Sequence, residues 1–270
     1  MAQIGNEGDD PDVVNSVVTV AQLNQILPAL TGVDAGNETA YQDYIDANPN
    51  SFSSPATAAE VQAMVDAVNS AESLGVSYVV STTGKIWMDR NLGATQVATS
   101  SADAAAYGDL YQWGRFTDGH EIRTSGTTTT NATTAEPNTG GAWDGLFILE
   151  SSSPYDWLAT QDNTLWDGVA GTNNPCPSGY RLPTETELDT ERANWGTNNA
   201  AGAFASPLKL PVAGNRSYSN GALGTVGSNG HYWSSTVSGT NARFLYFNIS
   251  NAFMTSHARA YGFSVRCLKE

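Results

Sequence analysis

Positive charge is scarce in this chain of 270 residues. The sequence contains 12 Lys and Arg against 27 Asp and Glu, which gives a formal net charge of −15 at pH 7. Nucleic-acid binding requires Lys and Arg that neutralise phosphates, so this charge balance argues against a nucleic-acid partner. Only 14% of the residues are charged, whereas Gly, Ser, Thr and Asn are abundant. This composition is typical of a turn-rich β protein that works outside a cell.

Long apolar runs are also missing. No stretch approaches the roughly 18 apolar residues that a transmembrane helix needs, so we expect no membrane span. The first residues, MAQIGNEGDDPD, have neither a basic start nor an apolar segment and do not predict a secretion signal. The length nevertheless suffices for one substantial core and a small second domain.

The sequence lacks motifs that bind metals or carry catalysis. The three histidines, His120, His231 and His257, are scattered, whereas a zinc site needs three or four converging ligands. We expect His120 on the surface and His257 in a contact loop. No GxSxG, P-loop, EF-hand or GxGxxG pattern occurs. We therefore expect no cofactor, no metal and no enzymatic activity.

The carboxylates show no catalytic pattern either. Their spacing does not imply general acid–base catalysis, and we interpret the pairs as solvated. The pairs considered are Asp109 with Glu121, and Glu185 with Glu187.

Cysteine occurs only twice, as Cys176 and Cys267, far apart in the chain. These residues form either one disulfide that closes a long loop, worth about 3–5 kcal/mol by the chain-entropy estimate, or two buried thiols. The spacing alone leaves both alternatives open.

The N-terminal quarter predicts helices. Residues 1–16 are acidic and polar, and we expect them to be poorly ordered. Residues 17–73 contain an internal repeat, in which 19–27 aligns with 57–65. Each copy begins with Thr followed three residues later by Gln or Glu, which is the capping box of a helix start. Pro28 should kink or end the first helix.

A third short helix is predicted between the two copies, over residues 38–47. Tyr41, Tyr44 and Ile45 share one face of it. We interpret 17–73 as a small helical module that serves as a spacer or tether. The alternative is that these helices pack on the main domain as one unit.

From residue 76 the pattern changes to the two-residue period of strands. Residues 77–80 and 85–88 flank a Ser-Thr-Thr-Gly turn and predict a β-hairpin. The Thr/Asn/Gly-rich stretch 124–141 predicts a long surface loop, and 208–214 predicts a short strand.

One further helix is predicted in this part of the chain. Thr184 and Glu187 form another capping box, and the helix should end near Trp195. The chain has seven Trp, which suggests that large aromatic side chains anchor a loop-rich fold.

The C-terminal stretch carries the clearest strand pattern. Side chains in 242–248 alternate between two sides, as a strand requires. The two sets are Leu245 and Phe247 on one side, and Phe244, Tyr246 and Asn248 on the other. Residues 262–267 alternate again, with Phe263, Val265 and Cys267 on one side. The intervening 253–261 shows neither period, and we predict a binding loop held on rigid strands.

Six spaced motifs resemble one known family. In chain order they are MDRNLGA, YGDLYQWGR, NPCPSGYRLPT, LKLPVAGNR, GHYWSST and YGFSVRC. Together they resemble the Fibrobacter succinogenes major paralogous domain, over about residues 76–270. That family has a C-type-lectin-like fold related to the domain of formylglycine-generating enzymes. The resemblance implies an α+β chain with small antiparallel sheets, few helices and many loops, preceded by the small helical module.

This resemblance bears on several residues left open above. It favours the disulfide between Cys176 and Cys267. Both cysteines fall in framework motifs, so an enzymatic role would lack its nucleophile. Arg90 and Arg115 also lie in motifs, and we interpret them as structural, paired with Asp89 or Asp109 or with backbone carbonyls. Glu136-Pro137-Asn138 matches a sugar-specifying triplet of calcium-dependent lectins, but the WND partner is missing and we interpret the match as chance.

The C-terminal part is also similar to the variable region of diversity-generating retroelement proteins, over about residues 215–267. The framework NARxLxFN…NAxMxxxxRAxGFSVRC leaves open positions whose residues are all reachable from an Asn codon by changing its adenines. Met254 and Trp233 are not reachable, and we assign them to the framework. The predicted ligand-binding residues are Phe244, Tyr246, Asn248, Phe253, Thr255, Ser256, His257, Ala258, Tyr261 and His231.

The resemblance implies a function. The chain is expected to display a diversifiable, solvent-facing recognition surface at the cell exterior, on a cell surface or on a virion. Its partner would be a protein or glycan ligand on another cell or virus. The alternative is a surface or secreted domain with a fixed structural or carbohydrate-binding role and no diversification.

Overall fold

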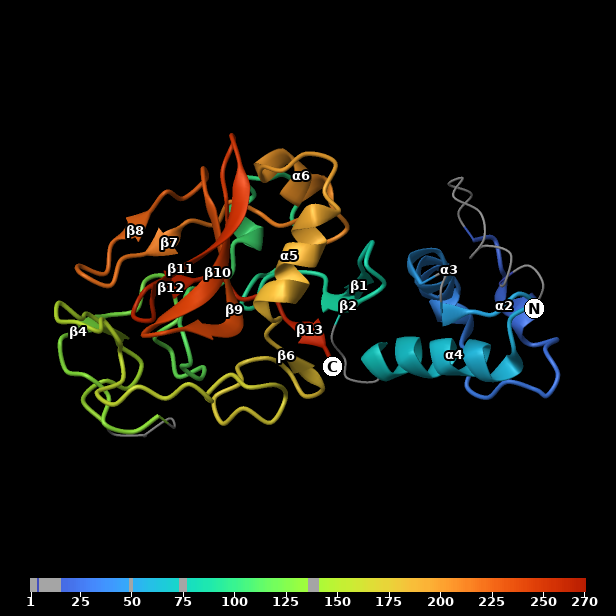
Figure 1. The fold of residues 1–270 in the computed structure, drawn as a ribbon, viewed down its shortest axis with the longest axis horizontal. Helices are drawn as coiled ribbons and strands as arrows, with labels where there is room; N and C mark the ends of the chain where they lie inside the picture. Colours follow the sequence, from blue (N-terminus) through green and yellow to red (C-terminus); the bar gives the residue numbers. More distant parts are fainter. Residues whose placement is uncertain (1–3, 5–15, 49–50, 73–76, 136–140) are drawn as a thin grey trace. The chain divides into compact units, whose positions relative to one another are not determined.

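The computed structural model describes residues 4, 16–48, 51–72, 77–135 and 141–270. The chain divides into two compact units, residues 1–87 and 88–270. Figure 1 shows the elements of both units. Most of the N-terminal stretch predicted to be poorly ordered, and the Glu136-Pro137-Asn138 triplet, lie outside the described residues. Within those residues, no helix combines the length and apolar character needed to cross a membrane.

The first unit is built from short helices and a hairpin. Its elements are α2 (Val20–Leu23), η1 (Ala35–Asn37), α3 (Glu38–Ala47), α4 (Ala58–Glu72), β1 (Tyr78–Val80) and β2 (Ile86–Met88), the last of which reaches the next unit. The capping boxes predicted at both helix starts are confirmed: Thr19 exchanges hydrogen bonds with Gln22, and Thr57 does so with Glu60. The first helix ends before Pro28, and it is shorter than predicted.

The core of the first unit forms between α3 and α4. The predicted third helix is confirmed over Glu38–Ala47, with Tyr41 and Ile45 fully buried against Val61 and Val65 of α4. Burying such side chains contributes about 1.5–3 kcal/mol each, which explains how short helices hold together.

The second unit is a mixed α/β structure with small sheets and long connections. Its helical elements are η3 (Ala104–Ala106), α5 (Glu185–Ala193) and α6 (Ala200–Ala205). Its strands are β3 (Tyr111–Gln112), β4 (Thr127–Thr128), β5 (Phe147–Ile148), β6 (Tyr180–Arg181), β7 (Asn215–Arg216), β8 (Leu223–Gly224), β9 (Gly230–Ser238), β10 (Asn241–Phe247), β11 (Ala252–Ala258), β12 (Gly262–Phe263) and β13 (Leu268–Lys269).

The three longest strands, β9, β10 and β11, form an antiparallel sheet in the order β11-β10-β9. A second sheet has the order β3-β12-β7-β8, β13 pairs with β6, and β4 runs parallel to β5. Helix α5 packs against the three-stranded sheet, as Figure 1 also shows.

Three local predictions are wrong. The strand pattern of 262–267 forms a strand only over Gly262–Phe263. Residues 208–214 do not form a strand, because Lys209 adopts a left-handed backbone with φ 45° that a strand cannot contain. Residues 253–261 are not a loop, because 252–258 form β11, which pairs with β10 along its whole length. The predicted β-hairpin, the helix started by Thr184 and the strand over 242–248 are confirmed.

Tryptophans anchor the loop-rich core of the second unit, as predicted. Trp113 and Trp233 are fully buried, and each indole N–H donates to a backbone carbonyl, that of Ser234 at 2.9 Å and that of Tyr111 at 2.8 Å. These bonds join segments far apart in sequence. The disulfide between Cys176 and Cys267 is also formed. By the chain-entropy estimate, a disulfide that closes a loop of this length contributes about 4–5 kcal/mol because it restricts the unfolded chain.

Candidate ligand-binding face

The pairing register assigns the side chains of the three-stranded sheet to two faces. Phe244 lies opposite Thr255 and Trp233, and Tyr246 lies opposite Phe253 and His231. Side chains of directly opposed residues share one face of a sheet. We call one face the aromatic face; its residues are His231, Trp233, Phe244, Tyr246, Phe253, Thr255 and His257. The other, the helix face, carries Tyr232, Arg243, Leu245, Phe247, Met254 and Ser256.

The helix face is the rigid support of the sheet. Leu245 and Phe247 are completely buried, which confirms their predicted orientation. The Phe247 ring stacks on Tyr232 at a centroid distance of 5.6 Å and meets the edge of Trp195 at 5.7 Å. Arg243 forms an ion pair with Glu185 of α5, with Nε 2.7 Å from the carboxylate. This packing fixes the backbone from which the aromatic face projects.

The aromatic face presents accessible rings along β10 and β11. Phe253 is 43% exposed, and its ring lies 5.1 Å from that of the half-buried Tyr246. The Tyr246 hydroxyl accepts hydrogen bonds from the side-chain amides of Asn229 (3.0 Å) and Asn248 (2.9 Å). His257 is exposed, and its ring lies 4.2 Å from Tyr261, in the turn after β11. These rings are held in place and accessible at the same time.

Two predicted contact residues are covered. Phe244 is only 3% exposed and His231 only 8%, so the prediction that their side chains face solvent is wrong. The cause is Phe263 of β12, whose ring lies 4.6 Å from Phe244 and 5.0 Å from His231. Burial also lowers the pKa of His231 to about 4.

Two further predicted residues point away from the aromatic face. Ser256 lies opposite Arg243 and so shares the helix face, and Ala258 is buried. Asn248 accepts hydrogen bonds from the backbone N–H groups of Ser250 and Asn251, so its side chain also closes the β10–β11 turn. The predicted residues that the structure brings together as accessible groups are Tyr246, Phe253, Thr255, His257 and Tyr261.

Sequence reasoning missed two tyrosines beside this face. The Tyr218 ring lies 4.7 Å from Tyr261, and the Tyr155 ring lies 5.3 Å from Tyr218. The Ala260 N–H donates to the Tyr155 carbonyl, which ties the 155 loop to the end of β11. Both tyrosines belong to irregular segments, where no periodicity marks a shared surface. An aromatic residue in an otherwise polar loop was the available signal.

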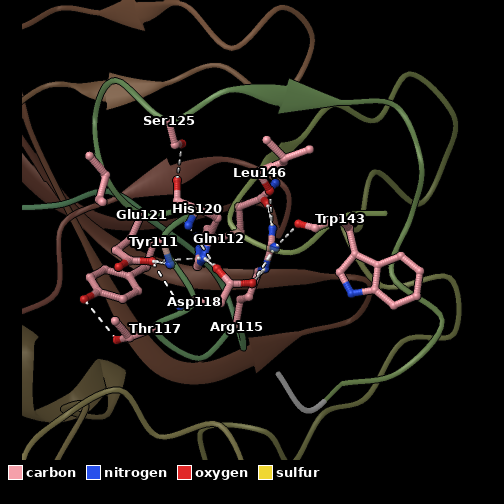
Figure 2. A network of polar contacts seen from close by, with 12 residues as sticks. Tyr111, Gln112, Arg115, Thr117, Asp118, His120, Glu121, Ser125, Trp143 and Leu146 are labelled. Carbon is pink, nitrogen blue, oxygen red and sulfur yellow. Dashed lines mark hydrogen bonds and ion pairs between the residues drawn. The ribbon is translucent and has the colours of Figure 1, made fainter. Parts of the chain in front are cut away.

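A second cluster is rich in ionisable groups but is buried, and Figure 2 shows it. His120 is fully buried, so its predicted surface position is wrong. Its Nδ1 lies 2.6 Å from the Asp118 carboxylate, and its Nε2 accepts the Gln112 backbone N–H at 3.2 Å. The second bond places the ring proton on Nδ1. Burial lowers the pKa of His120 to about 4, so the imidazole is neutral at neutral pH.

Arg115 completes this cluster. Its guanidinium donates to Asp118 at 2.6 Å, to the side-chain oxygen of Gln112 at 2.9 Å, and to the carbonyls of Leu146 (2.9 Å) and Trp143 (2.8 Å). Its predicted structural role is confirmed, with Asp118 rather than Asp109 as the carboxylate partner. Arg90 pairs with Asp89 as predicted, at 2.7 Å.

The predicted solvation of the carboxylates is also wrong for several of them. Glu121 is buried and accepts the Gly119 N–H at 2.9 Å, and desolvation raises its pKa. Glu187 forms an ion pair with Arg181 at 2.8 Å, and Glu185 pairs with Arg243. These groups are structural partners rather than free acids.

The buried cluster does not fit a metal ion. Ligand atoms of Asp118, His120 and Glu121 lie within 4.8 Å of one another. However, both imidazole nitrogens already have hydrogen-bond partners, and the Arg115 guanidinium forms an ion pair with the Asp118 carboxylate. A metal would have to displace a buried guanidinium, so we interpret the cluster as structural. We call it the polar network.

Comparisons of the chain with protein-family models, with curated proteins and with solved structures found no match.

Proposed function

We propose that this protein is a ligand-binding display protein, in which a C-type-lectin-like domain presents a diversifiable recognition surface. The observation that carries the proposal is the grouping of Tyr246, Phe253, His257 and Tyr261 as neighbouring, accessible rings over the packed helix face. The motif series of the sequence supports the same interpretation.

The physical basis of the proposal is that one face of the sheet stabilises the fold and the other is accessible. Leu245 and Phe247 pack the helix face into the core, so residues on the accessible side can change without disrupting the core. Tyr and Phe offer rigid contact area at low entropic cost, and Thr and His add adaptable hydrogen bonds. Recognition in this account needs no catalytic group.

The proposed setting is the cell exterior, a cell surface or a virion. The disulfide Cys176–Cys267 supports it, because disulfides persist mainly in oxidising environments. The proposed partner is a protein or glycan on another cell or virus. The high net negative charge favours partners other than nucleic acid.

A tolerance experiment tests the proposal. Codons 246, 253, 255, 257 and 261 are randomised together, the library is displayed on yeast, and folded clones are counted by resistance to protease. We expect most clones to remain folded. A control library at Leu245, Phe247 and Phe263 should lose the fold in nearly all clones. Equal losses in both libraries would contradict a diversifiable face.

The genomic neighbourhood separates this proposal from a domain without diversification. A diversified gene should lie near a reverse transcriptase and near a second copy of the codons for about residues 215–267. The two copies should differ only where the second has adenine. A locus with neither feature would favour the fixed structural or carbohydrate-binding role.

A further inference from the structure

Three tyrosines form a continuous row at the edge of the aromatic face. We call Tyr155, Tyr218 and Tyr261 the tyrosine row. Successive ring centroids lie 5.3 and 4.7 Å apart, with interplanar angles of 59° and 68°. The row continues to His257, whose ring lies 4.2 Å from Tyr261. Three separate segments of the chain therefore supply one surface that joins the aromatic face.

The hydroxyls of this row are unengaged. Within the described part of the chain, the phenol oxygens of Tyr155, Tyr218 and Tyr261 have no hydrogen-bond partner. By contrast, the hydroxyl of Tyr232 donates to the Pro211 carbonyl at 2.8 Å, and that of Tyr246 is held by two amides. The row thus combines ring surface with free donors and acceptors, which is the combination that a polar ligand with an apolar face requires.

The position of Tyr155 is not explained by packing. Its backbone is left-handed, with φ 58°, a conformation that is strained for a non-glycine residue. Its ring is 36% exposed, so core burial does not offset that cost. Two backbone bonds hold it there: its N–H donates to Ser152, and its carbonyl accepts the Ala260 N–H. A strained residue that presents an exposed ring points to recognition.

The surface has no charged group of its own. No residue of the tyrosine row or of the accessible aromatic face is Lys, Arg, Asp or Glu. Glu150 lies beside Tyr218 in the backbone, but its carboxylate accepts hydrogen bonds from Asn131 at 2.7 Å and from the Ser152 N–H at 2.6 Å. The net charge of −15 also repels anionic ligands. These charges favour a neutral ligand over an anionic one.

We infer that the tyrosine row is a stacking subsite for a neutral saccharide, with Tyr155 and Tyr218 as binding residues that extend the ligand face. Sugar rings have apolar C–H faces bordered by hydroxyls. Those faces stack on the tyrosine rings, and the free phenol groups bond the sugar hydroxyls. This inference rests on the proposed function and names the chemistry of its ligand.

Binding of the full chain to an array of neutral, sialylated and sulfated glycans tests the inference. The best-bound oligosaccharide is then titrated calorimetrically against variants. We expect binding to neutral glycans alone, at least ten-fold weaker binding for Tyr155→Ala and for Tyr218→Ala, and a smaller loss for Tyr155→Phe, which keeps the ring. Phe116→Ala is the matched control, because Phe116 is 37% exposed and lies outside the row. Melting temperatures confirm that each variant is folded.

The outcomes separate this inference from the proposed function. If Phe253→Ala weakens glycan binding but Tyr155→Ala and Tyr218→Ala do not, the tyrosine row is not a subsite and the display face stands. If no neutral glycan binds, or if anionic glycans bind better, the saccharide inference is overturned. The tolerance experiment on the aromatic face then still tests the proposed function, independently of the glycan result.

Discussion

The polar network and the aromatic face differ in how many of their side chains are already engaged in contacts within the protein. The network has the chemistry of an active site, with an imidazole, two carboxylates and a guanidinium, yet Arg115, His120 and Glu121 are buried and Asp118 is bonded to both Arg115 and His120 (Figure 2). The aromatic face has little such chemistry, yet its outer rings, those of Tyr246, Phe253 and His257, are accessible. The comparison teaches that unused binding capacity, rather than reactive residue types, marks the better candidate for a site.

Breaking the polar network should have the largest effect on stability. Arg115→Met leaves the Asp118 carboxylate and two carbonyls without their buried partner, and we expect a loss of about 3–5 kcal/mol in the free energy of unfolding. Chemical denaturation measures this loss. The control is Arg90→Met, whose partly exposed pair with Asp89 should contribute at most about 1 kcal/mol. Similar losses for the two variants would show that the network is not a structural centre.

Acid should weaken the fold through the same network. The pKa of His120 is lowered by burial from 6.5 to about 4. As the pH falls below about 6.5, His120 becomes protonated in the unfolded chain but stays neutral in the folded chain. The free energy of unfolding therefore decreases until about pH 4. A shift of this size corresponds to about 3 kcal/mol.

Denaturation curves between pH 7 and pH 4 measure this effect. His120→Gln is the matched variant, because the amide can accept the Gln112 N–H without titrating. We expect a flatter stability profile for it than for the wild-type chain. Parallel profiles would mean that His120 does not contribute to the pH dependence of stability.

A smaller effect is expected at the support of the helix face. Thr184 caps α5, whose Glu185 pairs with Arg243, so Thr184→Ala should cost about 1 kcal/mol. Thermal denaturation measures it. Thr186→Ala, at an exposed position of the same helix, is the control and should change stability little. An equal loss for both would argue against the capping role.

Local patterns predicted the elements whose signals are local. The capping box at Thr184, the apolar face of 38–47 and the alternation of 242–248 each correspond to an observed element. Strand β11 was not predicted because both of its faces mix polar and apolar side chains. Met254 shares one face with Ser256, and Phe253 shares the other with Thr255. A two-residue period is invisible in such a strand.

The remaining errors concern contacts between distant segments. Phe244 has the alternation of an exposed residue and is covered by Phe263, a residue of another sheet. His120 lies in a polar stretch and is buried because Gln112 and Asp118 satisfy its ring. The tyrosine row joins three loops. None of these arrangements leaves a periodic trace in the sequence.

The central claim is that the accessible rings of the aromatic face and the adjoining Tyr261 can change without loss of the fold, and the melting temperature of one triple variant tests it most directly. The variant replaces Tyr246, Phe253 and Tyr261 together by Ala, with Leu245→Ala as the comparison from the helix face. We predict that the triple variant melts within a few degrees of the wild-type chain, whereas Leu245→Ala, at a cost of about 2–5 kcal/mol, melts far lower. A triple variant that melts as low as Leu245→Ala would contradict the claim.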